Sequence, residues 1–163
     1  MEPIILDDLD YKILGLIAND TRISFLEVSR ICNVSGAAVH QRVHKMTANN
    51  IIIGSEFKLN FEKIGFKTCT YMRLKFKDAS DIDSIADSLN NISELLECHR
   101  TLDNYDLLVR ILSRDNAHLL RIIENKIRPL GLCHSESIVS YKEYFKKQIR
   151  FTPEEEAPQH TTE

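Results

Sequence analysis

The fold of the first third of the chain is decided by residues 24–46, which read SFLEVSRICNVSGAAVHQRVHKM. Ser24 and the glutamate three residues later have capping-box spacing, which predicts a helix over residues 25–32. The turn-forming residues 33–36 end this helix, and Ser35 among them can cap another helix. The apolar positions of that next helix are Val39, Val43 and Met46. This stretch therefore predicts a short helix, a tight turn and a longer amphipathic helix.

Another helix precedes this pair, and an extended segment follows it. Apolar residues recur every three or four positions from Leu6 to Ile17, and acidic residues begin the stretch, which predicts a helix over residues 7–18. Residues 51–59 are β-branched at first and then alternate, as a strand does. We therefore expect a helix-turn-helix domain at residues 1–54 and a β linker at residues 55–66.

Charge is distributed unevenly along this first part. The whole chain has a net charge of −3, so DNA binding would require a local basic surface. Residues 28–55 contain no Asp or Glu, whereas the rest of residues 1–54 contains six acids. The basic and imidazole side chains in the acid-free stretch are Arg30, His40, Arg42, His44 and Lys45. The positive field therefore coincides with the second and third helices.

The face of the third helix opposite its apolar stripe carries small residues first and hydrogen-bond donors further along, as a helix that enters the major groove requires. Gln41 can pair with an adenine edge, and Ala37 can contact a thymine methyl group. Basic side chains and the capped helix start can bind phosphates. The predicted DNA contacts are Ser35, Gly36, Ala37, Gln41, Arg42, His44 and Lys45.

A helix of this composition can also be an ordinary solvated surface. Three further features favour DNA: the capped short helix before it, the four-residue turn and the acid-free stretch. We therefore interpret the first domain as a DNA-binding module.

From Thr68 onward the pattern alternates between strands and helices. Strands are predicted over residues 68–76, 95–102, 105–112 and 134–144, and helices over residues 81–89 and 114–126. A short turn at Asp103-Asn104 joins the two middle strands. This βαββαβ order is that of a ferredoxin-like domain at residues 67–150, so the fold class is α+β. With both helices on one face of the sheet, a second copy of the chain is the natural cover for the other face.

Other features exclude several classes of protein. The chain has no paired carboxylates, nucleophile elbow or phosphate-binding glycine loop, so we expect no enzyme and no cofactor. Its four cysteines lie far apart without zinc-finger spacing, so we expect reduced thiols and no metal. No apolar run approaches the ~18 residues that span a bilayer, which predicts a cytoplasmic protein. The acidic residues 151–163 are expected to be a disordered tail.

An ordered set of motifs resembles one known family. Residues 6–14, 22–29 and 34–43, followed by Ile52-Ile53-Gly54, are similar to the helix-turn-helix half of the Lrp/AsnC (feast/famine) transcription regulators. Glu97-Cys98-His99, Asp106-Leu107-Leu108 and Gly131 resemble the ferredoxin-like effector and dimerisation half of that family. The resemblance implies a winged-helix-like DNA-binding domain, dimers that can assemble into octamers, and an amino acid or related small metabolite as effector.

The resemblance also implies an effector site between subunits. By position, it comprises Thr101, Leu102, Asp103, Asn104 and Asp106, which face Ser135 and Ser137 of a neighbouring subunit. This chain departs from the family at the turn, where Asp103-Asn104 replaces a common Gly-Asp pair. Asp and Asn can adopt the left-handed conformation expected of that turn. The extra carboxylate can repel the carboxylate of an amino acid or select a different ligand, and the pair can also be a turn former without any effector.

Two functions remain open at this point. The first is a sequence-specific DNA-binding transcriptional regulator, homodimeric or larger, which binds double-stranded DNA and responds to an effector between subunits. Two recognition helices about one DNA turn (~34 Å) apart require dimerisation. The alternative is a metabolite-binding regulatory subunit of a metabolic enzyme that does not bind DNA. The first function is the one that we favour.

Overall fold

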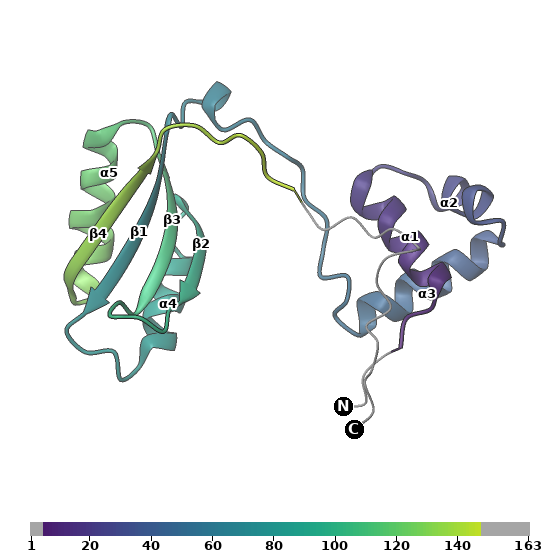
Figure 1. Cartoon of the computed structure of the whole chain (residues 1–163), viewed down its shortest axis with the longest axis horizontal. Coiled ribbons are helices and arrows are strands. Elements are labelled where there is room, and N and C mark those ends of the chain that lie inside the picture. The colour runs from purple at the N-terminus through teal and green to yellow at the C-terminus, as the bar shows by residue number, and fades with distance from the viewer. Residues whose placement is uncertain (1–4, 148–163) are drawn as a thin grey trace. The chain divides into compact units, whose positions relative to one another are not determined.

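The computed structural model describes residues 5–147, so the predicted acidic tail at residues 151–163 lies outside the described residues. Residues 5–58 belong to one compact unit and residues 59–145 to another. The first unit is helical, and the second combines a four-stranded sheet with helices (Figure 1). Among the described residues, no helix is long and apolar enough to cross a bilayer.

The helical unit consists of α1 (Asp8–Asn19), α2 (Phe25–Cys32) and α3 (Gly36–Ala48), in the predicted order. Each helix starts at a side-chain cap, and two of these caps, Ser24 and Ser35, are the ones that the sequence predicts. Asp7 accepts the Asp10 N–H at 2.8 Å, Ser24 Oγ accepts the N–H of Glu27, and Ser35 Oγ accepts the N–H of Ala38. The apolar stripes meet in one core, whose buried members are Ile13, Leu14, Val28, Val39 and Met46.

Asn33 sets the turn between α2 and α3. It ends α2 in the left-handed conformation, with φ 55° and ψ 46°. The N–H of Val34 then donates to the carbonyl of Ser29 at 3.0 Å, and the chain redirects to the Ser35 cap. Glycine, which has no β-carbon, adopts this conformation most readily. Among residues that have a β-carbon, asparagine is one of the few that tolerate it. The crossing of α2 and α3 therefore depends on one backbone position.

The Asn33→Val variant should lower the free energy of unfolding of the helical unit by about 1 kcal/mol, because a β-branched residue fits poorly at positive φ. Urea unfolding followed by circular dichroism measures the change. Asn33→Gly is the control and should lose much less stability. Equal losses in the two variants would show that the asparagine side chain, not the backbone conformation, determines the turn.

The second unit has the predicted βαββαβ order. Its elements are β1 (Thr68–Phe76), α4 (Ile82–Asn90), β2 (Leu95–Arg100), β3 (Leu107–Ser113), α5 (Asn116–Ile122) and β4 (Leu132–Ser140). The strands form an antiparallel sheet in the order β2-β3-β1-β4. α5 continues through one π-helical turn at Ile123–Ile127 and a 3-10 turn, and Gly131 at φ 92° then reverses the chain into β4.

Both helices pack on the same face of the sheet. Alternate residues of the two central strands, such as Met72 of β1 and Val109 of β3, are buried in one cluster with Leu89 of α4 and Ile122 of α5. The other face carries the intervening residues, among them Tyr71, Arg73 and Arg110. No described helix covers that face.

The structure differs from the sequence prediction at the linker and at one loop. Residues 55–66 contain no strand, only the 3-10 turn Glu62–Ile64, because a strand needs a hydrogen-bonded neighbour and this segment has none among the described residues. β2 and β3 are joined by a six-residue loop, 101–106, instead of a two-residue turn. Neither Asp103 nor Asn104 is left-handed, since side-chain hydrogen bonds hold the longer loop.

Candidate functional site

One face of α3 is free within the helical unit. Val39 and Met46 are buried against α1 and α2, and the 3.6-residue period then directs the opposite side of the helix outward. Of the seven predicted DNA contacts, six are exposed, and they are Ser35, Gly36, Ala37, Gln41, His44 and Lys45. These side chains and the start of the helix form one continuous surface, which we call the α3 outer face.

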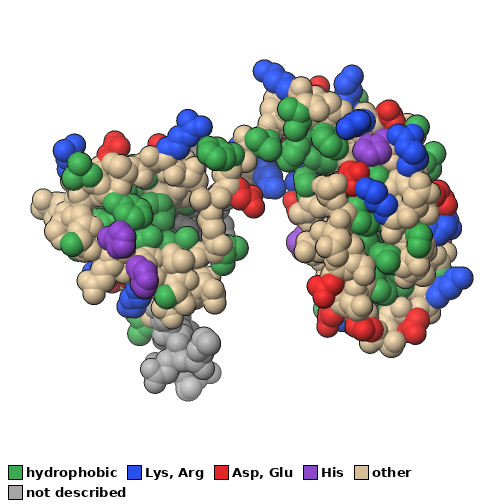
Figure 2. Space-filling view, turned by 180° about the vertical axis from the view of Figure 1, so that it is seen from behind, with side chains coloured by type: hydrophobic (Ala, Val, Ile, Leu, Met, Phe, Trp, Pro, Cys, Tyr) green, Lys and Arg blue, Asp and Glu red, His purple; other side chains and the backbone are tan. Residues whose placement is uncertain are grey.

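The α3 outer face carries hydrogen-bond donors and small side chains. The first-turn N–H groups of α3 point out of the helix start and add a partial positive charge there. Imidazole side chains lie at the surface of this unit beside apolar ones (Figure 2). His40 packs edge-on against Phe25 of α2, with ring centres 5.8 Å apart. Since α3 contains no acid, this face can approach a phosphate backbone without charge repulsion.

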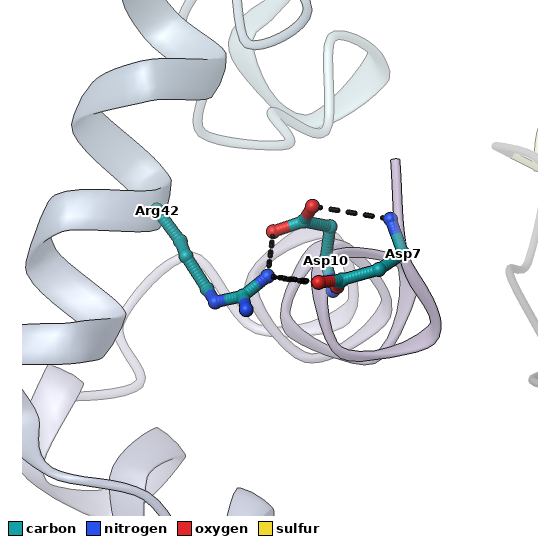
Figure 3. A network of polar contacts seen from close by, with 3 residues as sticks. All are labelled: Asp7, Asp10 and Arg42. Atoms are coloured by element: carbon teal, nitrogen blue, oxygen red, sulfur yellow. Dashed lines mark hydrogen bonds and ion pairs between the residues drawn. The ribbon is translucent and has the colours of Figure 1, made fainter. Parts of the chain in front are cut away.

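Arg42 is the exception among the predicted DNA contacts. Its Nη1 lies 2.7 Å from Oδ1 of Asp7 and 2.7 Å from Oδ1 of Asp10, both at the start of α1 (Figure 3). The Asp10 side chain is only 7% exposed, so its carboxylate depends on this cation. Arg42 thus joins α3 to α1 instead of extending from the α3 outer face. Asp7 and Asp10 were recognised from the sequence only as N-terminal helix residues.

The Arg42 guanidinium also lowers the pKa of Asp7. Its hydrogen bond, together with the backbone N–H of Asp10, holds the pKa of Asp7 below the usual 3.8. In return, the two carboxylates raise the pKa of Arg42. The pair is therefore fully charged at neutral pH.

The residues predicted to bind an effector lie in the 101–106 loop and on β4. The Thr101 hydroxyl donates to the carbonyl of Tyr105 at 2.7 Å, and Asp103 accepts the N–H of Tyr105 at 2.8 Å. Asp106 accepts from Lys75 at 3.0 Å and from the N–H of Phe76 at 2.8 Å. Burial opposes ionisation of Asp106, yet these two donors hold its pKa below the usual value.

The other predicted effector residues are less engaged. Leu102 and Asn104 are exposed at the tip of the loop. Ser135 and Ser137 pair with Leu74 and Met72, so they share the sheet face that the helices cover, toward its β4 edge. Within one chain the structure therefore does not bring them together with Asp103. The predicted meeting of the loop with a neighbour's serines remains a prediction.

Sequence reasoning missed the residues that surround the loop. Arg73 of β1 contacts both Asp103 of the loop and Glu136 of β4, and the Tyr105 ring lies over its guanidinium. These residues are far apart in sequence, and only the sheet register brings them together. The alternation of β1 could have placed Arg73 on the helix-free face, but not beside Asp103.

Among residues 5–147, no group of three or more potential metal ligands is present.

A helix-turn-helix unit with a free recognition helix, linked to a ferredoxin-like unit, defines a two-domain regulator. Residues 6–47 match the AsnC-type helix-turn-helix domain, and residues 69–149 match the Lrp/AsnC ligand binding domain. The chain belongs to the Lrp/AsnC family and is a transcriptional regulator. This assignment decides against the alternative of an enzyme's regulatory subunit.

Relatives and solved structures agree with this assignment. The chain is 27% identical to the regulatory protein AsnC of Haemophilus influenzae over 89% of this chain and 97% of that protein. It is 30% identical to the HTH-type transcriptional regulator Ptr1 of Methanocaldococcus jannaschii, over 77% of this chain and 84% of Ptr1. The structure of Escherichia coli AsnC superposes with a TM-score of 0.82 at 23% identity, covering 90% of this chain and 99% of AsnC.

One structural neighbour was solved with an amino acid. It is the transcriptional regulator NMB0573 from Neisseria meningitidis, as a complex with L-Met, with a TM-score of 0.80 and 20% identity. The match covers 87% of this chain and 94% of the NMB0573 chain. This likeness shows a shared fold.

The Arg42→Met variant should lower the free energy of unfolding of the helical unit by about 2 kcal/mol, because Asp10 would keep a buried carboxylate without its cation. Lys45→Met is the matched control, since Lys45 is exposed on the same helix, and its stability should be nearly unchanged. Urea unfolding of both variants at pH 7 measures the difference. If both variants were as stable as the wild type, the ion pair would have no structural role.

The same ion pair predicts a pH dependence. A carboxylate whose folded pKa is depressed stabilises the fold above its unfolded pKa, and this contribution disappears as the pH falls through the folded pKa. For Asp7 the loss should begin below about pH 4. The stability difference between wild type and Arg42→Met should therefore shrink as the pH falls below about 4. A difference that stays constant over this range would contradict the assigned pairing.

Proposed function

We propose that the α3 outer face reads a specific DNA site in the major groove and that two copies of the chain present two such helices. The observation that carries the proposal is the exposed, acid-free α3 outer face, held by a buried core and by the Arg42 ion pair. In this role Gln41 and Ala37 contact base edges. Lys45, His44 and the helix start at Ser35 and Gly36 contact phosphates. The protein acts in the cytoplasm, with the DNA.

The proposed homodimer is supported by surfaces that one chain leaves open. The helix-free sheet face includes Ile138, which is 61% exposed opposite Tyr71. In the linker, the exposed apolar residues Phe57 and Leu59 lie two positions apart, as residues on one face of a strand do, and Ile53 just before the linker is exposed as well. Pairing with the linker of a second copy would give this segment the hydrogen-bonded neighbour that it lacks in one chain. We propose that the linker and the part of the sheet face around Ile138 are covered in the dimer or in a larger assembly.

We further propose that the 101–106 loop is the effector site, completed by Ser135 and Ser137 of a neighbouring subunit. The support is the match of residues 69–149 to a ligand binding domain and the fold shared with a regulator crystallised with L-Met. An effector would act through its different affinity for two arrangements of the DNA-binding domains. An amino acid or a similar small metabolite fits this role.

The DNA proposal is tested by selecting bound fragments from randomised DNA and measuring variants on the selected site. Lys45→Ala should weaken binding to every sequence and reduce the slope of log affinity against log salt by about 1. Gln41→Ala should cost about 1–3 kcal/mol on the selected site and much less on unrelated DNA. The control is Lys12→Ala, because Lys12 is an exposed lysine of α1. This variant should change neither the affinity for the selected site nor the salt dependence of binding. Equal losses on all sequences for Gln41→Ala would exclude Gln41 from base reading.

The dimer proposal is tested with Ile138→Asp, which places a charge on the helix-free sheet face. Sedimentation equilibrium should show a dissociation constant at least about ten-fold higher than that of the wild type, because the charge would be desolvated at the interface. Leu120→Asp is the matched control, since Leu120 is similarly exposed on α5, and it should assemble normally. Unchanged assembly of Ile138→Asp would remove this sheet face from the interface.

A further inference from the structure

A cluster of charged and aromatic side chains surrounds the 101–106 loop on the helix-free face of the sheet, and its centre is Arg73. Nη1 of Arg73 lies 3.4 Å from Oδ2 of Asp103, and Nη2 contacts Glu136. The Cζ of Arg73 lies 4.6 Å from the centre of the Tyr105 ring. The ring of His134 is stacked on that of Tyr105, with the ring centres 5.8 Å apart. The guanidinium is thus held by two carboxylates and one aromatic ring.

The two carboxylates are held in different ways. Glu136 belongs to β4 and is paired directly opposite Arg73 in the sheet, so the strand ladder fixes its position. Asp103 belongs to the loop, its side chain is 47% exposed, and its contact with Arg73 is long for an ion pair. A competing anion would therefore displace Asp103 from Arg73 before it displaced Glu136.

Asp103 also makes a hydrogen bond within the loop. Its Oδ1 accepts the N–H of Tyr105, and this bond is the main cause that holds the pKa of Asp103 below the usual value. The loop conformation and the ring that covers Arg73 are therefore both linked to the side chain at position 103.

Arg73 also has unused capacity to donate. Its Nε is buried and has no hydrogen-bond partner among the described residues. A guanidinium presents its donors as a planar fork that matches a carboxylate. The nearby cation on the same face, Lys75, is paired with Asp106 at 3.0 Å, more closely than Arg73 is with Asp103 at 3.4 Å. Arg73 is therefore the group at this loop that is suited to a carboxylate of an incoming molecule.

We propose that Asp103 acts as an internal substitute for the carboxylate of an effector. Its carboxylate occupies the Nη1 side of Arg73 and holds the loop closed when no effector is present. The ligand class that fits the site is a small molecule with a free carboxylate, and it binds only in competition with Asp103. This inference rests on the proposal that the 101–106 loop is the effector site.

The test uses the full-length protein and Asp103→Asn. Asparagine keeps the side-chain oxygen that accepts the Tyr105 N–H but removes the charge that competes for Arg73. The twenty standard L-amino acids are titrated into each protein by calorimetry, and each one that binds is repeated as its carboxamide. We expect at least one amino acid to bind Asp103→Asn roughly two- to five-fold more tightly than the wild type, in line with removal of a partly exposed ion pair. The carboxamide should show no gain.

The control is Asp78→Asn, which removes an equal charge from an exposed position of the same unit outside the Arg73 cluster. It should bind amino acids as the wild type does. If an amino acid binds wild type and Asp103→Asn equally, the effector site stands and the role of Asp103 is overturned. If no amino acid binds either protein, the proposed effector site fails and this inference fails with it. A gain that the carboxamide shares would also overturn the inference, because Arg73 would then not be reading a carboxylate.

Discussion

A small three-helix unit can bury only one side of each helix, and the rest of this protein depends on that constraint. Val39 and Met46 of α3 fill the core, so the opposite side of the helix has to face outward. The Arg42 ion pair with α1 closes one edge of the buried side. The result is a rigidly mounted helix whose outer face carries donors and no acids. DNA recognition requires such a mounting, because side chains can read bases only when the helix enters the groove in a fixed orientation.

The same one-sided burial shapes the second unit. Met72 and Val109 face the helices, whereas Tyr71 and Arg110 face away from them. A sheet with one open face and an alternating apolar linker supports association with another copy, which is what a regulator with one recognition helix per chain requires. In this proposal the second unit both pairs the recognition helices and carries the loop through which a metabolite changes their arrangement.

Charge has two separate uses in this chain. On α3, the absence of acids leaves cations and donors available to an external polyanion. At the 101–106 loop, by contrast, Arg73 is matched by Asp103 and Glu136 from its own chain. A cation that is already paired binds an incoming anion only in competition with its own carboxylates. The two surfaces therefore differ in which partner neutralises their cations.

The sequence by itself determined the order of elements, the helix caps at Ser24 and Ser35, and the exposed face of α3, because each depends on residues a few positions apart. Only the tertiary structure decided the long-range pairs. Arg42 meets Asp10 across 32 positions, and Arg73 meets Glu136 across 63, because helix packing and strand register bring them together. Local periodicity contains no information about such partners, so it did not show that Arg42 pairs with α1, and it missed the Arg73 cluster. For the same reason it predicted a strand in the linker, although a strand exists only beside a hydrogen-bonded neighbour.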